Sequence, residues 1–422
     1  MNNTVRYFFV IAVATVLLLA VHPVDALDRA MIYAPKVNGY VLDQPMQVVG
    51  QAAMKSSVFF WVDGKFVGGI AVNKPVSKGS AVGWFTYTYR PKLKPGKHTL
   101  ESQVVKGKVK STYAKFTFTV PAVWPRKIDG AIVATPEWNQ LPFGIMIENT
   151  PAARPQAGLS DASVIYETVA ESGVTRFIAF FPQSVKPKSV GPIRSLRPYY
   201  VDWAKEFDAL LIHAGGSLDA FRETGNLKVR AYDSLTKVGA AYTARRCYGV
   251  HCLYTDTQRL TKLVQNAKVA GLNAVGEGWK FKDPAPLKQR PNTKKKLIIQ
   301  FSSTTYQVDW VYDRASNRYR RFQAGVPAKD KNTNRQLEVA SVLVQLVPKE
   351  RVVDRQGRLI LQLIGRGKAL LFRDGQYITL RWEKKSLFDR TRFYLSNGKE
   401  VEFNRGATWV EVVPGARKVL YQ

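Results

Sequence analysis

Alternating apolar and polar residues characterise residues 27–122. The runs QVVGQA, SVFFWVDGKFVGGIAV, GWFTYTYR, HTLESQVV and YAKFTFTV follow a period of two, and turn residues separate them. This pattern is typical of strands that bury one face, and Asp63-Gly64 between two β-rich runs predicts a tight hairpin. We therefore expect residues 27–122 to form an antiparallel β-sandwich.

The pattern changes in residues 123–295, where strand-like and helix-like stretches alternate. FGIMIEN, SVIYETVA, TRFIAFFP and DALLIHAGG are short apolar runs, whereas segments 197–207, 217–225 and 255–271 are helix-like. Strands interleaved with helices predict an α/β core with a mostly parallel sheet.

Period-two alternation returns in residues 296–422, which we expect to form a β-rich C-terminal domain. Asp374-Gly375 again predicts a hairpin. Proline-containing linkers at 121–136 and 282–296 separate the three regions. The chain is thus predicted to be a multidomain protein, as its length of 422 residues also suggests.

Residues 1–26 have the layout of a secretory signal peptide. Arg6 precedes an apolar run from Phe8 to Val21, and Val24 and Ala26 are the small residues before a cleavage site. The apolar run is shorter than the ~20 residues that a membrane-spanning helix needs, so we expect cleavage, with an uncleaved anchor as the alternative. Either outcome predicts an extracytoplasmic protein, which is secreted, periplasmic or on the cell surface.

A net charge of +31 adds an expectation about the partner. A strongly basic protein concentrates polyanions around itself. For an exported protein we expect an anionic cell-envelope polymer or glycan, rather than cytoplasmic nucleic acid, and contact with a membrane only through an uncleaved signal segment. Extracellular DNA, and a charge that only maintains solubility, remain alternatives.

The two cysteines, Cys247 and Cys252, lie in the sequence CYGVHC. Outside the cytoplasm such a pair is expected to form a disulfide, with free thiols as the second possibility. His251 between them suggests a metal site as a third, but zinc-like ligand spacing is missing. The sequence also lacks a Walker loop, and without a G-x-S-x-G elbow no Ser/His/Asp arrangement is indicated. We expect no metal and no cofactor.

Unusual local sequence is concentrated between Glu148 and His251. Four arginines there are candidates for holding anionic groups, because the guanidinium plane matches carboxylate and phosphate. The alternative is that they form ion pairs with acidic residues such as Asp202 or Glu206. These candidate binding residues are Arg154, Arg176, Arg194 and Arg197.

A second candidate feature is the end of the strand that carries His213. Gly215 and Gly216 follow it and precede a helix-like stretch, whose first N–H groups are expected to be available to an anion. We therefore count Gly215 and Gly216 among the predicted binding residues. His251, whose imidazole could act as a base or a ligand, is counted with them.

Catalysis is a competing interpretation. Glu167 lies in an apolar strand, where burial is expected to raise its pKa towards that of a general acid. Glu171 or His213 is expected to assist it, as in the paired carboxylates of glycoside cleavage. The alternative is that Glu167 has a structural hydrogen-bond or arginine partner.

Two resemblances follow from these stretches. APKVNGYVLDQPMQVVGQA, VFFWVDGKFVG and LKPGKHTLESQV resemble bacterial immunoglobulin-like modules. GIMIENTPAARPQAGLSDASVIYE, ESGVTRFIAFF, VGPIRSLRPYYVDWAKEFDALLIHAGGS and VHCLYT resemble the YerB-like family of exported proteins with a domain of unknown function, and RLILQLIGRGKALLFRDGQYITLRWEK resembles its C-terminal domain. The first resemblance implies a spacer or adhesion module, and the second an envelope location with no established reaction. Ser163, Val250 and Cys252 depart from the family pattern.

Two functions remain open from the sequence. The favoured one is binding of an anionic wall polymer or glycan through an arginine-rich cleft of the core. The alternative is a cell-wall glycan hydrolase or lyase that uses Glu167 as acid or base. Whether the chain is an enzyme is therefore undecided at this point.

Overall fold

The computed structural model describes residues 29–36, 39–41, 46–91, 93–134, 137–236, 241–243, 251–292 and 296–421. The predicted signal peptide and Cys247 lie outside these residues. The chain divides into two compact units, Met1–Ala122 and Val123–Gln422.

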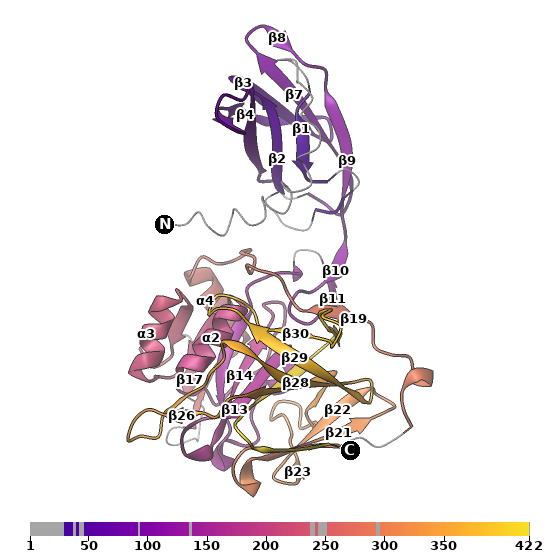
Figure 1. Ribbon diagram of the computed structural model, residues 1–422. Coiled ribbons are helices and arrows are strands. Elements are labelled where there is room, and N and C mark those ends of the chain that lie inside the picture. The colour runs from indigo at the N-terminus through magenta and orange to yellow at the C-terminus, as the bar shows by residue number, and fades with distance from the viewer. Residues whose placement is uncertain are drawn as a thin grey trace. The chain divides into compact units, whose positions relative to one another are not determined.

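The first unit consists of two antiparallel sheets (Figure 1). One has the strand order β1-β2-β6-β5, and the other the order β4-β3-β7-β8 with β9 paired to β7. The strands are β1 (Met31–Ala34), β2 (Met46–Ala53), β3 (Ser56–Val62), β4 (Lys65–Val72), β5 (Lys74–Pro75), β6 (Val82–Tyr89), β7 (Gly96–Lys106), β8 (Val109–Lys110) and β9 (Ala114–Val120). Its resemblance to immunoglobulin-like modules stays a prediction.

Side-chain alternation builds the core of this unit. Val58, Phe60 and Val62 of β3 point inward and pack with residues of both sheets. Asp63 and Gly64 join β3 to β4 with φ values of 49° and 74°, as a hairpin turn of the mirror-image type requires. The prediction of this hairpin from the sequence is confirmed.

The second unit is organised around one sheet of ten strands, in the order β16-β15-β12-β14-β13-β32-β25-β28-β29-β30. In this order the strands are β16 (Arg230–Asp233), β15 (Leu210–His213), β12 (Phe143–Glu148), β14 (Thr175–Phe181), β13 (Val164–Val169), β32 (Thr408–Pro414), β25 (Ser341–Val347), β28 (Gly365–Arg373), β29 (Gln376–Lys384) and β30 (Arg392–Tyr394).

A second sheet packs on one face of the ten-stranded sheet. Its order is β23-β22-β21-β20-β33, with β24 paired to β22. These strands are β20 (Lys296–Gln300), β21 (Gln307–Asp313), β22 (Arg318–Gln323), β23 (Val326–Pro327), β24 (Glu338–Val339) and β33 (Lys418–Tyr421). Trp310 of β21 contacts Trp409 of β32 with ring centroids 5.3 Å apart, so the two sheets share one core.

Helices cover the opposite face. They are α2 (Pro198–Glu206), α3 (Leu218–Asn226) and α4 (Thr257–Asn266), close to the expected positions, and they lie near one another in Figure 1. Trp203 of α2 stacks on Tyr166 of β13 with centroids 4.8 Å apart. Short strand pairs complete the unit: β10 (Val123–Pro125) with β11 (Ile132–Ala134), β17 (Tyr242–Thr243) with β18 (Leu253–Tyr254), β19 (Lys280–Lys282) with β31 (Glu402–Asn404), and β26 (Arg351–Val352) with β27 (Leu359–Ile360).

One expectation about this unit is wrong. Only four of the nine strand pairings in the large sheet are parallel, so the sheet is mixed rather than mostly parallel. Residues 123–295 and 296–422 lie in one compact unit, in which β13 pairs in parallel with β32 over Val164–Glu167, and their division into two domains stays a prediction. Local periodicity identifies strands but carries no information about their distant partners.

A buried ion pair also joins these two halves of the chain. Lys384 Nζ of β29 lies 2.5 Å from Glu206 Oε1 of α2, and neither side chain is exposed. Thr391 donates to the same carboxylate from its backbone N–H at 3.0 Å and from its hydroxyl at 2.8 Å.

Replacing Lys384 by methionine is expected to lower the free energy of unfolding by about 3–5 kcal/mol, because it leaves the Glu206 carboxylate buried without its cation. Urea denaturation of the full chain measures the change. Arg222→Ala is the control, since Arg222 and Asp219 form a pair with side chains 74% and 54% exposed; it should change stability by less than about 0.5 kcal/mol. Equal effects from both variants would contradict this role of Lys384.

Asp202 of α2 lies near this pair. Its pKa is raised to about 7, mainly by burial; Lys384 opposes the shift, and the nearby Glu223 and Glu206 add to it. A carboxyl with a raised pKa in the folded state favours folding at low pH, and this contribution is lost as pH rises from about 4 to about 7.

Asp202→Asn should remove this pH dependence, because asparagine imitates the protonated acid without ionising. Between pH 5 and pH 8 the wild-type unfolding free energy should fall by about 2–3 kcal/mol more than that of the variant. Urea titrations at the two pH values test it. Parallel pH profiles would show that Asp202 ionises freely in the folded protein.

Candidate functional site

Glu167 lies in the middle of the contact between the two sheets of the second unit. Its side chain is fully buried, and Arg321 of β22 donates from Nη2 to Glu167 Oε2 at 2.7 Å. Tyr166, one residue earlier, packs on α2, so strand alternation directs Glu167 to the face that β22 covers. The partner of Glu167 is thus an arginine from the distant C-terminal part of the chain.

Aromatic rings surround the Arg321 guanidinium. Its carbon lies 4.5 Å from the centroid of Trp409 and 5.6 Å from each of Trp310 and Phe177. Arg321 is only 1% exposed. Cation–π contacts stabilise a guanidinium that has lost its hydration, and the Glu167 carboxylate balances its charge.

A second buried acid adjoins this pair. Glu411 is the register partner of Glu167 on the neighbouring parallel strand, and it is fully buried. Trp310 donates from its indole N–H to Glu411 Oε1 at 2.8 Å. Burial raises the pKa of Glu411 well above its ordinary value, and the charge of Glu167 raises it further, so Glu411 favours its protonated form.

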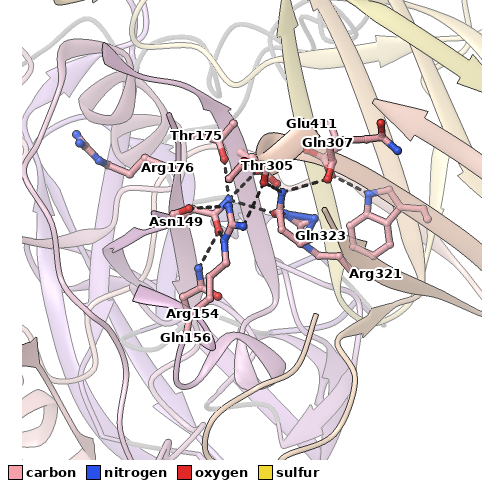
Figure 2. Close-up of polar contacts among 12 residues, drawn as sticks. Asn149, Arg154, Gln156, Thr175, Arg176, Thr305, Gln307, Arg321, Gln323 and Glu411 are labelled. Atoms are coloured by element: carbon pink, nitrogen blue, oxygen red, sulfur yellow. Dashed lines mark hydrogen bonds and ion pairs between the residues drawn. The ribbon is translucent and has the colours of Figure 1, made fainter. Parts of the chain in front are cut away.

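Asn149 connects this acid pair to the polar residues beside it (Figure 2). Its amide N–H₂ donates to Thr175 Oγ1 at 2.7 Å, to Gln323 Oε1 at 3.2 Å and to Glu167 Oε1 at 3.3 Å. Its carbonyl oxygen accepts from Gln156 at 2.9 Å and from Arg154 Nε at 3.0 Å. Two parts of the chain, 149–175 and 321–323, therefore meet in one hydrogen-bonded network.

A cavity of about 290 Å³ adjoins the network. Its lining includes three basic residues, Arg154, Arg321 and Lys329, and no acidic residue. Nη1 of Arg321 has no hydrogen-bond partner among the described residues. The cavity wall therefore carries positive charge. We call it the Arg321 cavity.

Arg176 does not join the Arg321 cavity. In the register of β14 with β13, Phe177 lies opposite Glu167 and Arg176 lies opposite Thr168, so Arg176 points to the other face of the sheet. There Arg176 and Arg197 both pair with Glu171. Figure 2 likewise shows Arg176 apart from the bonded network.

Arg194 also lies outside the cavity. Its Nε lies 3.3 Å from Glu148 Oε1, and His251 Nδ1 lies 2.7 Å from Glu148 Oε2. Glu148 is 2% exposed. Of the four predicted arginines, only Arg154 lines the cavity, and the expected four-arginine cleft is therefore wrong. The alternative, that the arginines form ion pairs with acidic residues, holds for Arg176, Arg194 and Arg197. Their partners are Glu148 and Glu171 rather than Asp202 and Glu206.

The glycines after β15 do not offer a free set of N–H groups. The Gly215 N–H donates to Asp233 Oδ1 at 2.9 Å, and the Ala220 N–H in the first turn of α3 is capped by Ser217 Oγ at 3.2 Å. His213 is buried, and its Nδ1 lies 3.0 Å from the Gly215 carbonyl oxygen. At the predicted anion site of Gly215 and Gly216, the Asp233 carboxylate already accepts the Gly215 N–H.

The proposed catalytic group of Glu167, Glu171 and His213 is not assembled. Burial acts to raise the pKa of Glu171, but the hydrogen bond from Arg197 and the charge of Arg176 outweigh it, so the pKa lies below its usual value. Glu171 therefore stays ionised. Glu167 is bound to Arg321 and His213 to Gly215, so the three side chains have separate partners.

Cys252 is one half of a disulfide. Within the described ranges, no three histidine, cysteine, aspartate or glutamate residues are grouped as metal ligands. Nor does any helix in the described part of the chain have the length and hydrophobicity to cross a membrane.

Comparison with known proteins identifies the family. The model of "Protein of unknown function (DUF3048) N-terminal domain" matches residues 130–270, and the C-terminal domain model of the same family matches residues 297–410. The chain is 28% identical over 285 residues to the Bacillus subtilis (strain 168) protein named "Putative lipoprotein YerB", covering 65% of this chain and 81% of that protein. The chain belongs to the YerB-like family.

A solved structure supports this membership. The crystal structure of the YerB protein from Bacillus subtilis aligns with a TM-score of 0.62 and 25% identity, over 70% of this chain and 98% of that chain. The family is described as of unknown function.

Sequence reasoning missed the half of the site that the C-terminal part of the chain supplies. Arg321 and Gln323 occupy the same strand phase as buried Tyr319, and Glu411 shares a phase with buried Trp409. Polar residues in the inward phase of a strand are the available signal, because a buried charge needs a partner.

Arg321→Met should destabilise the second unit by about 3–5 kcal/mol, because it leaves Glu167 buried and unpaired beside Glu411. Adding Glu167→Gln to that variant should restore part of the loss, since glutamine brings no charge. Urea denaturation measures both. Arg320→Ala, on the outward phase with a side chain 47% exposed, should change stability by less than about 1 kcal/mol. A milder effect at Arg321 than at Arg320 would contradict this account of the ion pair.

Proposed function

We propose that this protein is exported and that its second unit binds an anionic group of a cell-envelope polymer or glycan in the Arg321 cavity. Export is supported by the signal-like layout of residues 1–26 and by a relative that has lipoprotein in its name. A net charge of +31 favours association with polyanions in that location.

The observation that carries the proposal is a cavity with three basic lining residues and no acidic one, one of which, Arg321, has a buried Nη1 with no hydrogen-bond partner among the described residues. A buried donor without a partner costs about 1–3 kcal/mol, which an oxygen of a bound group would recover. Arginine is well suited to carboxylate and phosphate oxygens.

The size of the cavity limits the ligand. About 290 Å³ is near the lower end of small-molecule sites, so the cavity suits one acidic sugar, carboxylate or phosphate group rather than a long stretch of polymer. Exposed Lys329 at the cavity and the half-buried Arg154 supply further charge. Binding of a polymer would then proceed by recognition of individual anionic groups along it.

Sedimentation with purified cell-wall sacculi tests the proposal. The full-length protein should co-sediment, and the double variant Arg154→Gln/Lys329→Gln should bind at least about tenfold more weakly with a salt slope reduced by about two, because two charge contacts are lost. Lys262→Gln/Lys385→Gln removes the same charge from positions that do not line the cavity. An equal loss in both double variants would reduce the proposal to nonspecific charge attraction.

The same experiment separates the alternatives. Soluble fragments released from sacculi by the wild type and not by Glu167→Gln would favour the hydrolase or lyase. The full burial of Glu167 and its bond to Arg321 favour binding instead. Stronger competition by duplex DNA than by teichoic-type polymer would favour the nucleic-acid alternative.

A further inference from the structure

The first unit has a group of aromatic side chains on the outer face of its five-stranded sheet. In β3 the residues that alternate with the core positions point outward, and they meet residues from β4 and from the segment before β9. We call this group the aromatic patch, and it consists of Phe59, Trp61, Phe66 and Tyr113.

The rings of the patch are in direct contact. Trp61 is central, with its centroid 5.4 Å from Phe66 and 5.1 Å from Tyr113, both edge to face. Phe59 lies 6.1 Å from Phe66. A Cβ atom at Gly69 would lie 2.7 Å from Phe59 Cδ1, so the Phe59 ring covers the β4 backbone at this glycine. The four rings thus form one continuous surface.

Two of the four rings are exposed, whereas Phe59 and Trp61 are partly buried. Phe66 is 59% exposed and Tyr113 is 47% exposed. Single exposed apolar residues are ordinary, but a contiguous group of large rings typically marks a binding surface. By contrast, Phe85 of the other sheet is a core residue at 3% exposure.

The surroundings of the patch indicate the charge of its partner. Residues 29–122 contain fourteen lysines and arginines and only three acidic residues. Exposed Lys65 and Lys110 belong to strands of the same sheet. Lys115 shares the strand phase of Tyr113 and pairs with Glu101 at 2.7 Å with its own side chain 61% exposed. A ligand on this surface therefore meets aromatic faces together with an excess of positive charge.

We propose that the aromatic patch binds an acidic polysaccharide. The C–H groups on the flat side of a pyranose ring pack against aromatic rings, and the lysines around the patch attract the carboxylates of the chain. A lipid surface fits less well, because the patch is formed of rings on a twisted sheet face rather than of a protruding aliphatic loop. The inference uses only the first unit and is independent of the Arg321 cavity.

Biolayer interferometry on immobilised hyaluronate oligosaccharide tests the inference, with poly-L-glutamate as a polyanion that has no sugar rings. The full-length protein should bind both probes. Trp61→Ala and Phe66→Ala should each weaken binding to hyaluronate at least about fivefold, the effect of losing one stacked ring, and should leave binding to poly-L-glutamate unchanged.

Two controls make the outcome decisive. Trp84→Ala removes a ring of the same type from the outer face of the other sheet, where it contacts Tyr33 at 5.4 Å, and it should bind hyaluronate like the wild type. Circular dichroism verifies folding, and the exposed positions Phe66 and Tyr113 serve if Trp61→Ala misfolds. Unchanged hyaluronate binding in the patch variants, or an equal loss on both probes, would overturn the inference. Failure in this assay leaves the sacculus result for Arg154 and Lys329 unaffected, so the two proposals are tested separately.

Discussion

The parallel pairing of β13 with β32 is the constraint on which the second unit depends. It places a strand from near the C-terminus between β13 and β25, so that both halves of the unit contribute to one sheet of ten strands. Without β32, β13 would present an unpaired edge. Buried ion pairs then connect the halves on each face, Lys384 with Glu206 on the helical side and Arg321 with Glu167 on the side of the second sheet.

Strand alternation separates the charged residues of this unit into two groups. Glu148 ends β12 and binds Arg194 and His251, whereas Asn149, the next residue, joins the network around Glu167. The division of Arg176 from Phe177 follows the same rule. Residues adjacent in the sequence therefore serve different sites: Arg176 and Arg197 share Glu171 on one face, whereas Arg154 joins the network around Glu167.

The Arg321 site contains buried charged groups, whose desolvation is unfavourable, together with contacts that offset this free energy. Burying a guanidinium and two carboxyls requires a large desolvation energy, which the ion pair, the aromatic rings and the protonation of Glu411 offset. One donor of Arg321 stays without a partner beside a cavity. Replacing a buried ion pair by well-packed apolar side chains is often neutral or stabilising, so this pair by itself is weak evidence that the site serves stability alone.

The sequence alone determined the elements and some of the turns. Period-two alternation identified the strands of the first unit and of the C-terminal region, and Asp63-Gly64 identified a hairpin, because side-chain direction and positive φ are local properties. Only the tertiary structure decided which strands pair, and hence that Arg321 rather than Arg176 meets Glu167. Partner choice between strands hundreds of residues apart depends on the complementarity of whole surfaces, which no local pattern encodes.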